Sequence, residues 1–279
     1  MEKSFGVIGG DRRQAELARL LEADGKQVLT YGLCRWKAEG AGTLEQAVAA
    51  DIVVLPLPLC KGEGVLNCEE DPVPTLELFR RLRPGQRVLA GQVKPQQQKE
   101  ALACGILLED YFLREELTVA NAAATAEAAI QIAMDRLDRS LLGMECFVLG
   151  FGRIGKLLSH RLHGLGARVT ATARKPADLA WIRAYGLRPL ETAKLDGKLS
   201  GAGVIFNTIP SLVLGESLLL QLPKDCLCID LASRQGIDLA AAERLGLPNI
   251  WARSLPGRLL PRTAAVVIRD AIYYILLEG

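Results

Sequence analysis

The sequence predicts an α/β protein made of two doubly wound parallel-sheet domains. Short apolar runs alternate with helical patterns through both halves of the chain, which is typical of parallel strands joined by crossover helices. A Gly-x-Gly-x-x-Gly pattern also stands between an apolar run and an amphipathic segment in the middle of the chain. The length of 279 residues fits two domains better than one.

The first half predicts a flavodoxin-like α/β domain over residues 1–118. Its predicted parallel strands are the apolar runs at residues 4–10, 27–33, 51–59, 86–93 and 105–112. Residues 12–24 predict a helix, because Leu17, Leu20 and Leu21 fall on one face. Residues 60–74 are predicted to form a loop after the third strand.

An alanine-rich segment follows and predicts one long helix over residues 119–137. It contains strong helix formers throughout and neither proline nor glycine. We expect this helix to connect the two domains, within a connector of residues 119–142.

The second half predicts a Rossmann domain over residues 143–261. Its predicted strands are residues 145–152, 168–174, 203–210, 226–233 and 249–255, and its predicted helices are residues 153–165, 177–186, 216–221 and 239–245. The remaining segment, residues 262–279, predicts a helix over 262–277. We expect its apolar residues to pack back on the first domain.

Composition excludes several classes of function. The net charge of +2 gives no basic footprint for nucleic acid or membranes. The first residues lack a signal-peptide core, and no run of about 18 apolar residues could span a bilayer. We therefore expect a cytoplasmic protein. The seven cysteines form no Cys-x-x-Cys pair, so we expect reduced thiols, with no disulfide framework and no metal site.

The glycine pattern predicts a dinucleotide site. Gly150 permits a tight turn, Gly152 lets the backbone approach a diphosphate, and Gly155 allows close packing of helix on strand. The N–H groups of Arg153 and Ile154 then open the following helix, whose N-terminus attracts anions. The alternative is a glycine turn that binds nothing.

The residues after the second strand of this domain predict NADP rather than NAD. Ala173, Arg174 and Lys175 stand where an acidic residue would accept hydrogen bonds from a free ribose 2′-hydroxyl. A small residue followed by two cations favours a 2′-phosphate instead. The alternative is that Arg174 and Lys175 are a solvated strand end.

A second glycine-containing turn, "GVIGGDRRQ" at residues 6–14, also follows a strand and opens a helix. It lacks the third glycine, so its match to the dinucleotide pattern is incomplete. We expect a tight structural turn. The alternative is a carboxylate site at the start of the helix.

This order of domains resembles that of the D-2-hydroxyacid dehydrogenases, which use a histidine as acid and base. The chain has two histidines, His160 and His163, and both fall off the apolar stripe of the predicted helix 153–165. We expect both on the surface, which disfavours oxidation of a secondary alcohol by a histidine–carboxylate pair.

Several motifs resemble the dipicolinate synthase A-subunit family more closely. They are "GVIGGDRRQ", "GEGV" (62–65), Asn121, Thr125 and Glu127, "NTIPSLVL" (207–214), "IDLASRQG" (229–236) and "SLPGRLLPRTAA" (254–265). They occur in the family's order between about residues 4 and 270. The chain departs from the family where Gln235, Gly236 and Ile237 replace a Pro-Gly-Gly, and where Arg262 replaces a lysine.

The resemblance implies a function. The family makes dipicolinate by oxidising dihydrodipicolinate with NADP, together with a flavoprotein B-subunit, in the mother cell of spore-forming bacteria. A small dicarboxylate would be the substrate. We also expect a homo-oligomer, whose number of copies the sequence does not predict.

The substrate is expected between the domains, at the carboxyl ends of both sheets. We predict that Glu127 takes the ring proton, and that Arg262 and Arg234 hold the substrate carboxylates. The other predicted substrate residues are Thr125 and Asn121 on the connecting helix, Pro56 at the third strand, and Ser233. The residues predicted to lie near the nicotinamide are Asn207, Thr208, Pro210 and Asp230, the last of which could instead cap a loop.

Three alternatives stay open at this point. Glu127 could be an ordinary exposed helix residue, and Arg234 could form a surface salt bridge. The whole chain could be a non-catalytic NADP-binding subunit that regulates the flavoprotein. It could also be a 2-hydroxyacid dehydrogenase that uses another base.

Overall fold

The computed structural model describes residues 3–38, 40–62, 64–68, 70 and 72–278. The chain forms two compact units, one made of Met1–Asn121 with Pro256–Gly279 and one of Ala122–Leu255. Each unit is built on a sheet whose strands are all parallel. This confirms the predicted α/β class with two doubly wound sheets.

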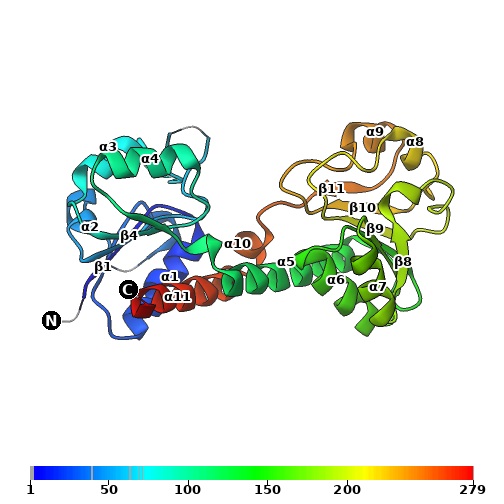
Figure 1. Ribbon diagram of the computed structural model, residues 1–279, viewed down its shortest axis with the longest axis horizontal. Coiled ribbons are helices and arrows are strands. Elements are labelled where there is room, and N and C mark those ends of the chain that lie inside the picture. Colours follow the sequence, from blue (N-terminus) through cyan, green and yellow to red (C-terminus); the bar gives the residue numbers. More distant parts are fainter. Residues whose placement is uncertain (1–2, 39, 63, 69, 71, 279) are drawn as a thin grey trace. The chain divides into compact units, whose positions relative to one another are not determined.

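The first unit has a five-stranded sheet in the order β2-β1-β3-β4-β5. Its elements are β1 (Phe5–Ile8), α1 (Arg12–Ala23), β2 (Val28–Tyr31), α2 (Leu44–Val48), β3 (Ile52–Val54), α3 (Thr75–Arg81), β4 (Arg87–Ala90), α4 (Pro95–Ala103) and β5 (Leu108–Asp110). Two short 3₁₀ turns, η1 (Cys34–Trp36) and η2 (Tyr111–Leu113), complete it. Helices α2, α3 and α4 cover one face of the sheet (Figure 1).

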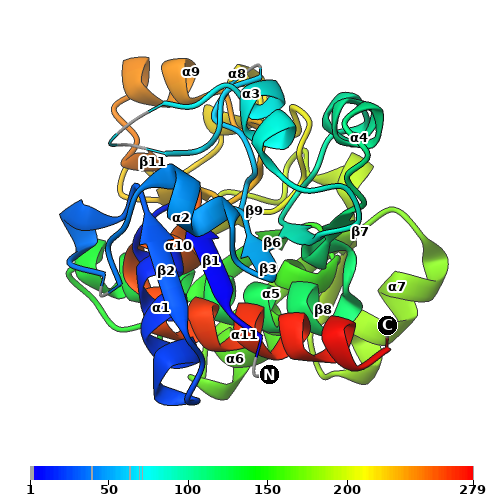
Figure 2. The same ribbon diagram turned by 90° about the vertical axis from the view of Figure 1, so that its left-hand side faces the viewer.

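The other face of this sheet is covered by α1 and by the last helix of the chain, α11 (Pro261–Glu278). Both views show α11 beside α1 (Figures 1 and 2). Ala265, Ile268 and Ile272 of α11 are buried in one cluster with Leu17 and Leu21 of α1. Helix α11 therefore completes the core of the first unit, to which α1 also contributes.

The second unit has a six-stranded sheet in the order β11-β10-β9-β6-β7-β8. Its elements are β6 (Glu145–Leu149), α6 (Arg153–Gly164), β7 (Arg168–Ala173), α7 (Pro176–Ala184), β8 (Arg188–Glu191), η3 (Thr192–Lys194), β9 (Val204–Asn207), α8 (Glu216–Leu219), β10 (Leu227–Asp230), α9 (Leu239–Arg244) and β11 (Asn249–Trp251). Helices α8 and α9 pack with the sheet in one buried cluster. The strand order reverses between β6 and β9, and this switch point is where such sheets bind ligands.

Two helices contain the points at which the chain passes from one unit to the other. Helix α5 spans Glu115–Arg136 and so begins before the predicted residue 119. Its first turn carries Glu115 and Glu116, which are favourable at the positive end of a helix. The short α10 (Leu255–Leu259) leads the chain back to the first unit.

The structure corrects several predicted elements. The strand predicted over 51–59 ends at Val54, because Pro56 and Pro58 have no N–H to donate to a sheet. The strand predicted over 105–112 gives way to η2 at Tyr111. Helices α2, α3 and α4 and strand β8 were not predicted, since they are short and their local patterns are weak.

The cysteines of the described chain are all free thiols, most of them buried. Burial raises the pKa of the Cys146 thiol to about 12, so this side chain stays a neutral hydrophobic group. None of the helices in the described part of the chain combines the length and the apolar character that a membrane span requires.

Candidate functional site

The glycine pattern forms the turn between β6 and α6. Gly150 has a φ of 98°, and a Cβ there would lie 2.5 Å from Thr208 Oγ1. A Cβ on Gly155 would lie 2.1 Å from the carbonyl oxygen of Gly150. The turn therefore excludes side chains at both positions, because the chain itself fills the space.

Gly152 differs from its two neighbours in the pattern. A Cβ there would meet nothing within 4 Å, and Gly152 is the N-cap of α6 without any side-chain cap. No acidic residue lies in the first turn of this helix. The N–H groups of Arg153 and Ile154 thus begin a helix whose positive end lacks a side-chain anion, and this geometry fits a diphosphate.

Two threonines brace the turn from the neighbouring strands. Thr208 Oγ1 donates to the carbonyl oxygen of Leu149 at 2.8 Å. The amide N–H of Gly150 donates to Thr172 Oγ1 at 3.1 Å. Thr208 was predicted to lie near the nicotinamide. In the structure its hydroxyl group donates its hydrogen bond to the glycine turn. Thr172 was not predicted, since a threonine inside a strand gives no local signal of this contact.

The residues that were predicted to read the ribose lie at the end of β7. Ala173 is buried and is the last residue of β7, and Arg174 and Lys175 follow it with exposed side chains. Neither cationic side chain pairs with any residue in the described part of the chain. Glu191, the strand partner of Ala173, is already paired with Lys194 at 2.8 Å.

At the ends of β9 and β10, Asn207 and Asp230 are fully buried and bonded to each other. Asn207 Nδ2 donates to Asp230 Oδ1 at 2.8 Å and to the carbonyl oxygen of Ile209 at 3.0 Å. Asp230 also accepts from the amides of Ala232, Gly236 and Ile237. These side chains hold the loops after both strands, so Asp230 caps a loop, and the proximity of both residues to the nicotinamide stays a prediction.

The two loops carry the other predicted residues of this unit. Pro210, Ser233 and Arg234 are all exposed. Gly236 locks the loops together, because a Cβ there would lie 2.3 Å from Asn207 Nδ2 and 2.4 Å from the carbonyl oxygen of Ile209. Gly236 stands within the segment that replaces the Pro-Gly-Gly. Its packing requires a residue without a side chain.

Glu127, the predicted base, is paired with an arginine of the same unit. Its carboxylate forms an ion pair with Arg161 of α6 at 3.1 Å, and the Glu127 side chain is 57% exposed. Arg161 lies about 12 Å along α6 from its first residue, at 1.5 Å per residue. This position matches the alternative interpretation of an exposed helix residue, and the catalytic role of Glu127 stays a prediction. Thr125 is buried on the same helix.

The remaining predicted substrate residues belong to the first unit. Pro56 is buried, and its carbonyl oxygen accepts from the amide of Gly91 at 3.0 Å. Asn121 is half-buried on α5, and Arg262 is exposed in the first turn of α11. Within "GEGV", Glu63 lies outside the described residues. A joint role of these residues with Thr125, Ser233 and Arg234 stays a prediction.

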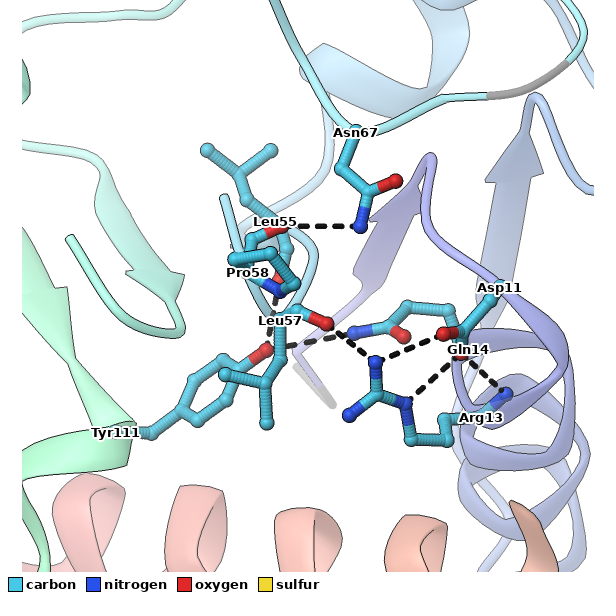
Figure 3. A network of polar contacts seen from close by, with 8 residues as sticks. All are labelled: Asp11, Arg13, Gln14, Leu55, Leu57, Pro58, Asn67 and Tyr111. Carbon is cyan, nitrogen blue, oxygen red and sulfur yellow. Dashed lines mark hydrogen bonds and ion pairs between the residues drawn. The ribbon is translucent and has the colours of Figure 1, made fainter. Parts of the chain in front are cut away.

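The glycine turn of the first unit is closed by its own side chains (Figure 3). Gly9 and Gly10 have φ values of 65° and 106°, and Asp11 caps α1 by accepting from the Arg13 amide. The Arg13 guanidinium donates two hydrogen bonds to the Asp11 carboxylate and one to the carbonyl oxygen of Leu57. The Arg13 side chain is only 7% exposed. This confirms the structural turn.

A second layer of contacts lies behind this pair (Figure 3). Tyr111 Oη donates to the carbonyl oxygen of Leu55 at 3.0 Å and accepts from Gln14 Nε2 at 3.4 Å. Complete burial raises the pKa of Tyr111, so the phenol remains a neutral donor. Asn67 Nδ2 donates to the carbonyl oxygen of Pro58 at 3.2 Å. The loop of residues 60–74 is thereby tied to the carboxyl end of β3.

Both histidines lie on the exposed face of α6, as predicted. His160 contacts the ring of Tyr185 edge-on, at 6.4 Å between ring centroids. Neither histidine belongs to the group of residues around the glycine turn.

Comparison with known proteins finds likeness along nearly the whole chain. Residues 4–112 match the N-terminal domain of the dipicolinate synthase A-subunit. The chain is 29% identical to the dipicolinate synthase A-subunit of Bacillus subtilis (strain 168), over 98% of this chain and 96% of that protein. The crystal structure of the dipicolinate synthase A-subunit from Bacillus halodurans has a TM-score of 0.86 at 27% identity, covering 99% of this chain and 98% of that one.

The fold is also that of a wider group. Apo D-lactate dehydrogenase from Escherichia coli has a TM-score of 0.59 at 14% identity, over 97% of this chain and 95% of that one. At this identity the likeness concerns the fold alone. The motifs, the match of residues 4–112 and the likeness along nearly the whole chain agree, and the chain is similar throughout to dipicolinate synthase A-subunits.

Proposed function

We propose that this protein oxidises dihydrodipicolinate to dipicolinate with NADP⁺, acting with a flavoprotein B-subunit. The observation that carries this proposal is the uncapped start of α6 beside Gly152, together with the unpaired side chains of Arg174 and Lys175 in the described part of the chain. A diphosphate and a 2′-phosphate are the anions that these two features suit. The similarity of the chain to dipicolinate synthase A-subunits supports the substrate.

The proposed reaction needs little acid–base chemistry. One hydride leaves a ring carbon of dihydrodipicolinate for NADP⁺, one proton leaves for solvent, and the products are dipicolinate, NADPH and H⁺. The nucleotide supplies the hydride acceptor. Formation of the aromatic ring drives the step, so the pairing of Glu127 with Arg161 is no obstacle. The protein orients its ligands and offsets their negative charge.

Each charged group of the reactants has a proposed partner on this chain. The amides that open α6 bind the diphosphate, and Arg174 and Lys175 bind the 2′-phosphate. Arg234 and Arg262, both exposed, bind substrate carboxylates. Arginine suits this role because its planar fork can hold a carboxylate through two parallel hydrogen bonds.

The deciding experiment measures NADPH formation by the purified chain with NADP⁺ and freshly generated dihydrodipicolinate, with and without the flavoprotein. Turnover by the chain alone supports a complete active site. Turnover only with both proteins supports a site that the flavoprotein completes. Absence of turnover in both mixtures contradicts the proposal, provided that the chain binds NADPH.

A second candidate is a non-catalytic NADP-binding subunit that regulates the flavoprotein. The ion pair of Glu127 favours it, because it removes the one carboxylate that had been predicted as a base. This candidate predicts that NADPH binds but that turnover survives any substitution at Arg234. The 2-hydroxyacid dehydrogenase alternative has no such support, because both histidines are exposed helix residues.

A further inference from the structure

Arg253 has an ordered side chain that the proposed function does not use. Its guanidinium lies over the ring of Trp251, with the central carbon 3.9 Å from the ring centroid. Trp251 is the last residue of β11, and its indole N–H donates to the carbonyl oxygen of Ala232 at 2.9 Å. The indole is thus fixed against the loop that follows β10, and the guanidinium is fixed on the indole.

Stacking occupies the face of this guanidinium and leaves its edge free. Arg253 is exposed, and within the described ranges its side chain makes neither an ion pair nor a hydrogen bond. Arg161 and Arg188 of the same unit are instead paired with Glu127 and Glu145. A stacked guanidinium with free N–H edges is already ordered for a planar anion, so it loses little side-chain freedom when one binds.

The position of Arg253 points to a ligand. Trp251 ends β11 beside Asp230 of β10, so both strands present their carboxyl ends here. Ser233 and Arg234 directly follow Ala232, the residue that holds the indole. Gly236 then fixes this loop against the loop after β9. The first residues of the loops after β9, β10 and β11 are therefore held together. We call this region, at the carboxyl ends of the three strands, the edge of the second unit's sheet.

This edge lies on one side of the switch point between β6 and β9. The proposed 2′-phosphate residues, Arg174 and Lys175, follow β7 on the other side. A dinucleotide that crosses the switch point consequently directs its nicotinamide half toward β9 and β10. The acid at this edge, Asp230, is buried and accepts hydrogen bonds from its own loop. The exposed charges at the ends of β10 and β11 are two arginines.

We infer that Arg253 takes the place proposed above for Arg262 as the second carboxylate-binding arginine, and that with Arg234 it holds a small planar dicarboxylate at this edge. The inference rests on the proposed function and adds the residue that discriminates a dicarboxylate from a monocarboxylate. Arg234 binds one carboxylate, and the edge of the stacked Arg253 guanidinium binds the other.

The test is calorimetric titration with dipicolinate and with picolinate, which lacks one carboxylate, in saturating NADPH. Wild type should bind dipicolinate at least about tenfold more tightly than picolinate, the expected value of one charge-assisted carboxylate contact. R253Q should lose about tenfold in dipicolinate affinity and little in picolinate affinity. R253K should fall between them, because lysine keeps the charge without the fork.

The matched control is R183Q. Arg183 is likewise exposed and has no side-chain partner in the described part of the chain, but it lies in the last turn of α7. R183Q should leave both affinities unchanged, and R253Q should leave NADPH affinity unchanged. Dipicolinate affinity of R253Q equal to that of wild type would overturn the inference, whether or not the melting temperature falls.

Failure of the proposed function gives a different result. A wild type that binds NADPH but not dipicolinate overturns the inference and the proposed substrate together. A wild type that does not bind NADPH overturns the cofactor assignment alone. The titrations are then run without nucleotide. The difference in dipicolinate affinity between wild type and R253Q again tests whether Arg253 binds a carboxylate.

Discussion

The two glycine turns of this protein both join a strand to a helix, and the residue at the N-cap of that helix differs between them. In the first unit the N-cap of α1 is Asp11, whose carboxylate accepts from the helix and from Arg13. In the second unit the N-cap of α6 is Gly152, which has no side chain and open space above it. Each turn also contains a glycine with positive φ, Gly10 and Gly150.

The difference teaches how one supersecondary structure serves two purposes. The positive end of α1 is neutralised by a carboxylate of the chain, and that carboxylate in turn orders a nearly buried arginine. The positive end of α6 has no such group, so an external anion must supply the charge. The carboxylate at the start of α1 stabilises the first unit. The start of α6 has no such carboxylate and is therefore suited to bind an external anion.

The largest effect is expected on NADPH affinity, when the aspartate that caps α1 is introduced at the N-cap of α6. G152D should fold normally, because the backbone is extended there and a Cβ meets nothing within 4 Å. NADPH affinity should fall by more than about hundredfold, since an aspartate repels the diphosphate and occupies its amides. Fluorescence titration with NADPH measures this.

The matched control for this substitution is G152N. Asparagine caps a helix as well as aspartate does but carries no charge. Its loss of affinity should be smaller than that of G152D, and the difference measures the charge repulsion. Equal NADPH affinity of G152D and wild type would contradict a diphosphate site at α6.

The next effect concerns the stability of the first turn. D11A should lower the free energy of unfolding by about 2–4 kcal/mol, because it leaves the nearly buried Arg13 guanidinium without its carboxylate. Urea denaturation measures the change. NADPH affinity should stay within about twofold of wild type, as expected for two independent turns. The double variant D11A/R13M should recover part of the lost stability, and a larger loss would contradict this account.

The smallest of the three effects sharpens the choice of cofactor. R174A should weaken NADPH binding by about tenfold, the value of one charge-assisted contact to a phosphate. NADH binding should not change, because NADH lacks the 2′-phosphate. Parallel titrations with both nucleotides give the ratio directly. Equal losses for NADPH and NADH would show that Arg174 does not read the 2′ position.

The fold was predictable because its signals are local. Apolar runs, glycine turns and the alanine-rich helix each appear within a short window, and each corresponds to an element of the structure, although several bounds differ. The roles of individual side chains were less predictable. Asn207 and Asp230 carry polar groups at strand ends, which is typical of ligand contacts, yet they bond to each other across adjacent strands.

Residues far apart in the sequence account for most of what was missed. The partner of Glu127 is Arg161, and the partner of Arg13 beyond its own turn is Leu57. Neither pairing has a local pattern, because each depends on which elements the tertiary fold brings together. Arg253 was missed for a similar reason, since only the structure shows that its guanidinium lies on Trp251.

The discontinuous first unit has a consequence for synthesis of the chain. Its core includes Ala265, Ile268 and Ile272, whereas Ala122–Leu255 forms a contiguous unit. On the ribosome, the second unit is therefore complete before the first, although domains generally fold in order from the N-terminus. Until α11 emerges, the apolar face of α1 has no cover and is open to chaperones. Synthesis of α11 thus decides when the first unit becomes stable.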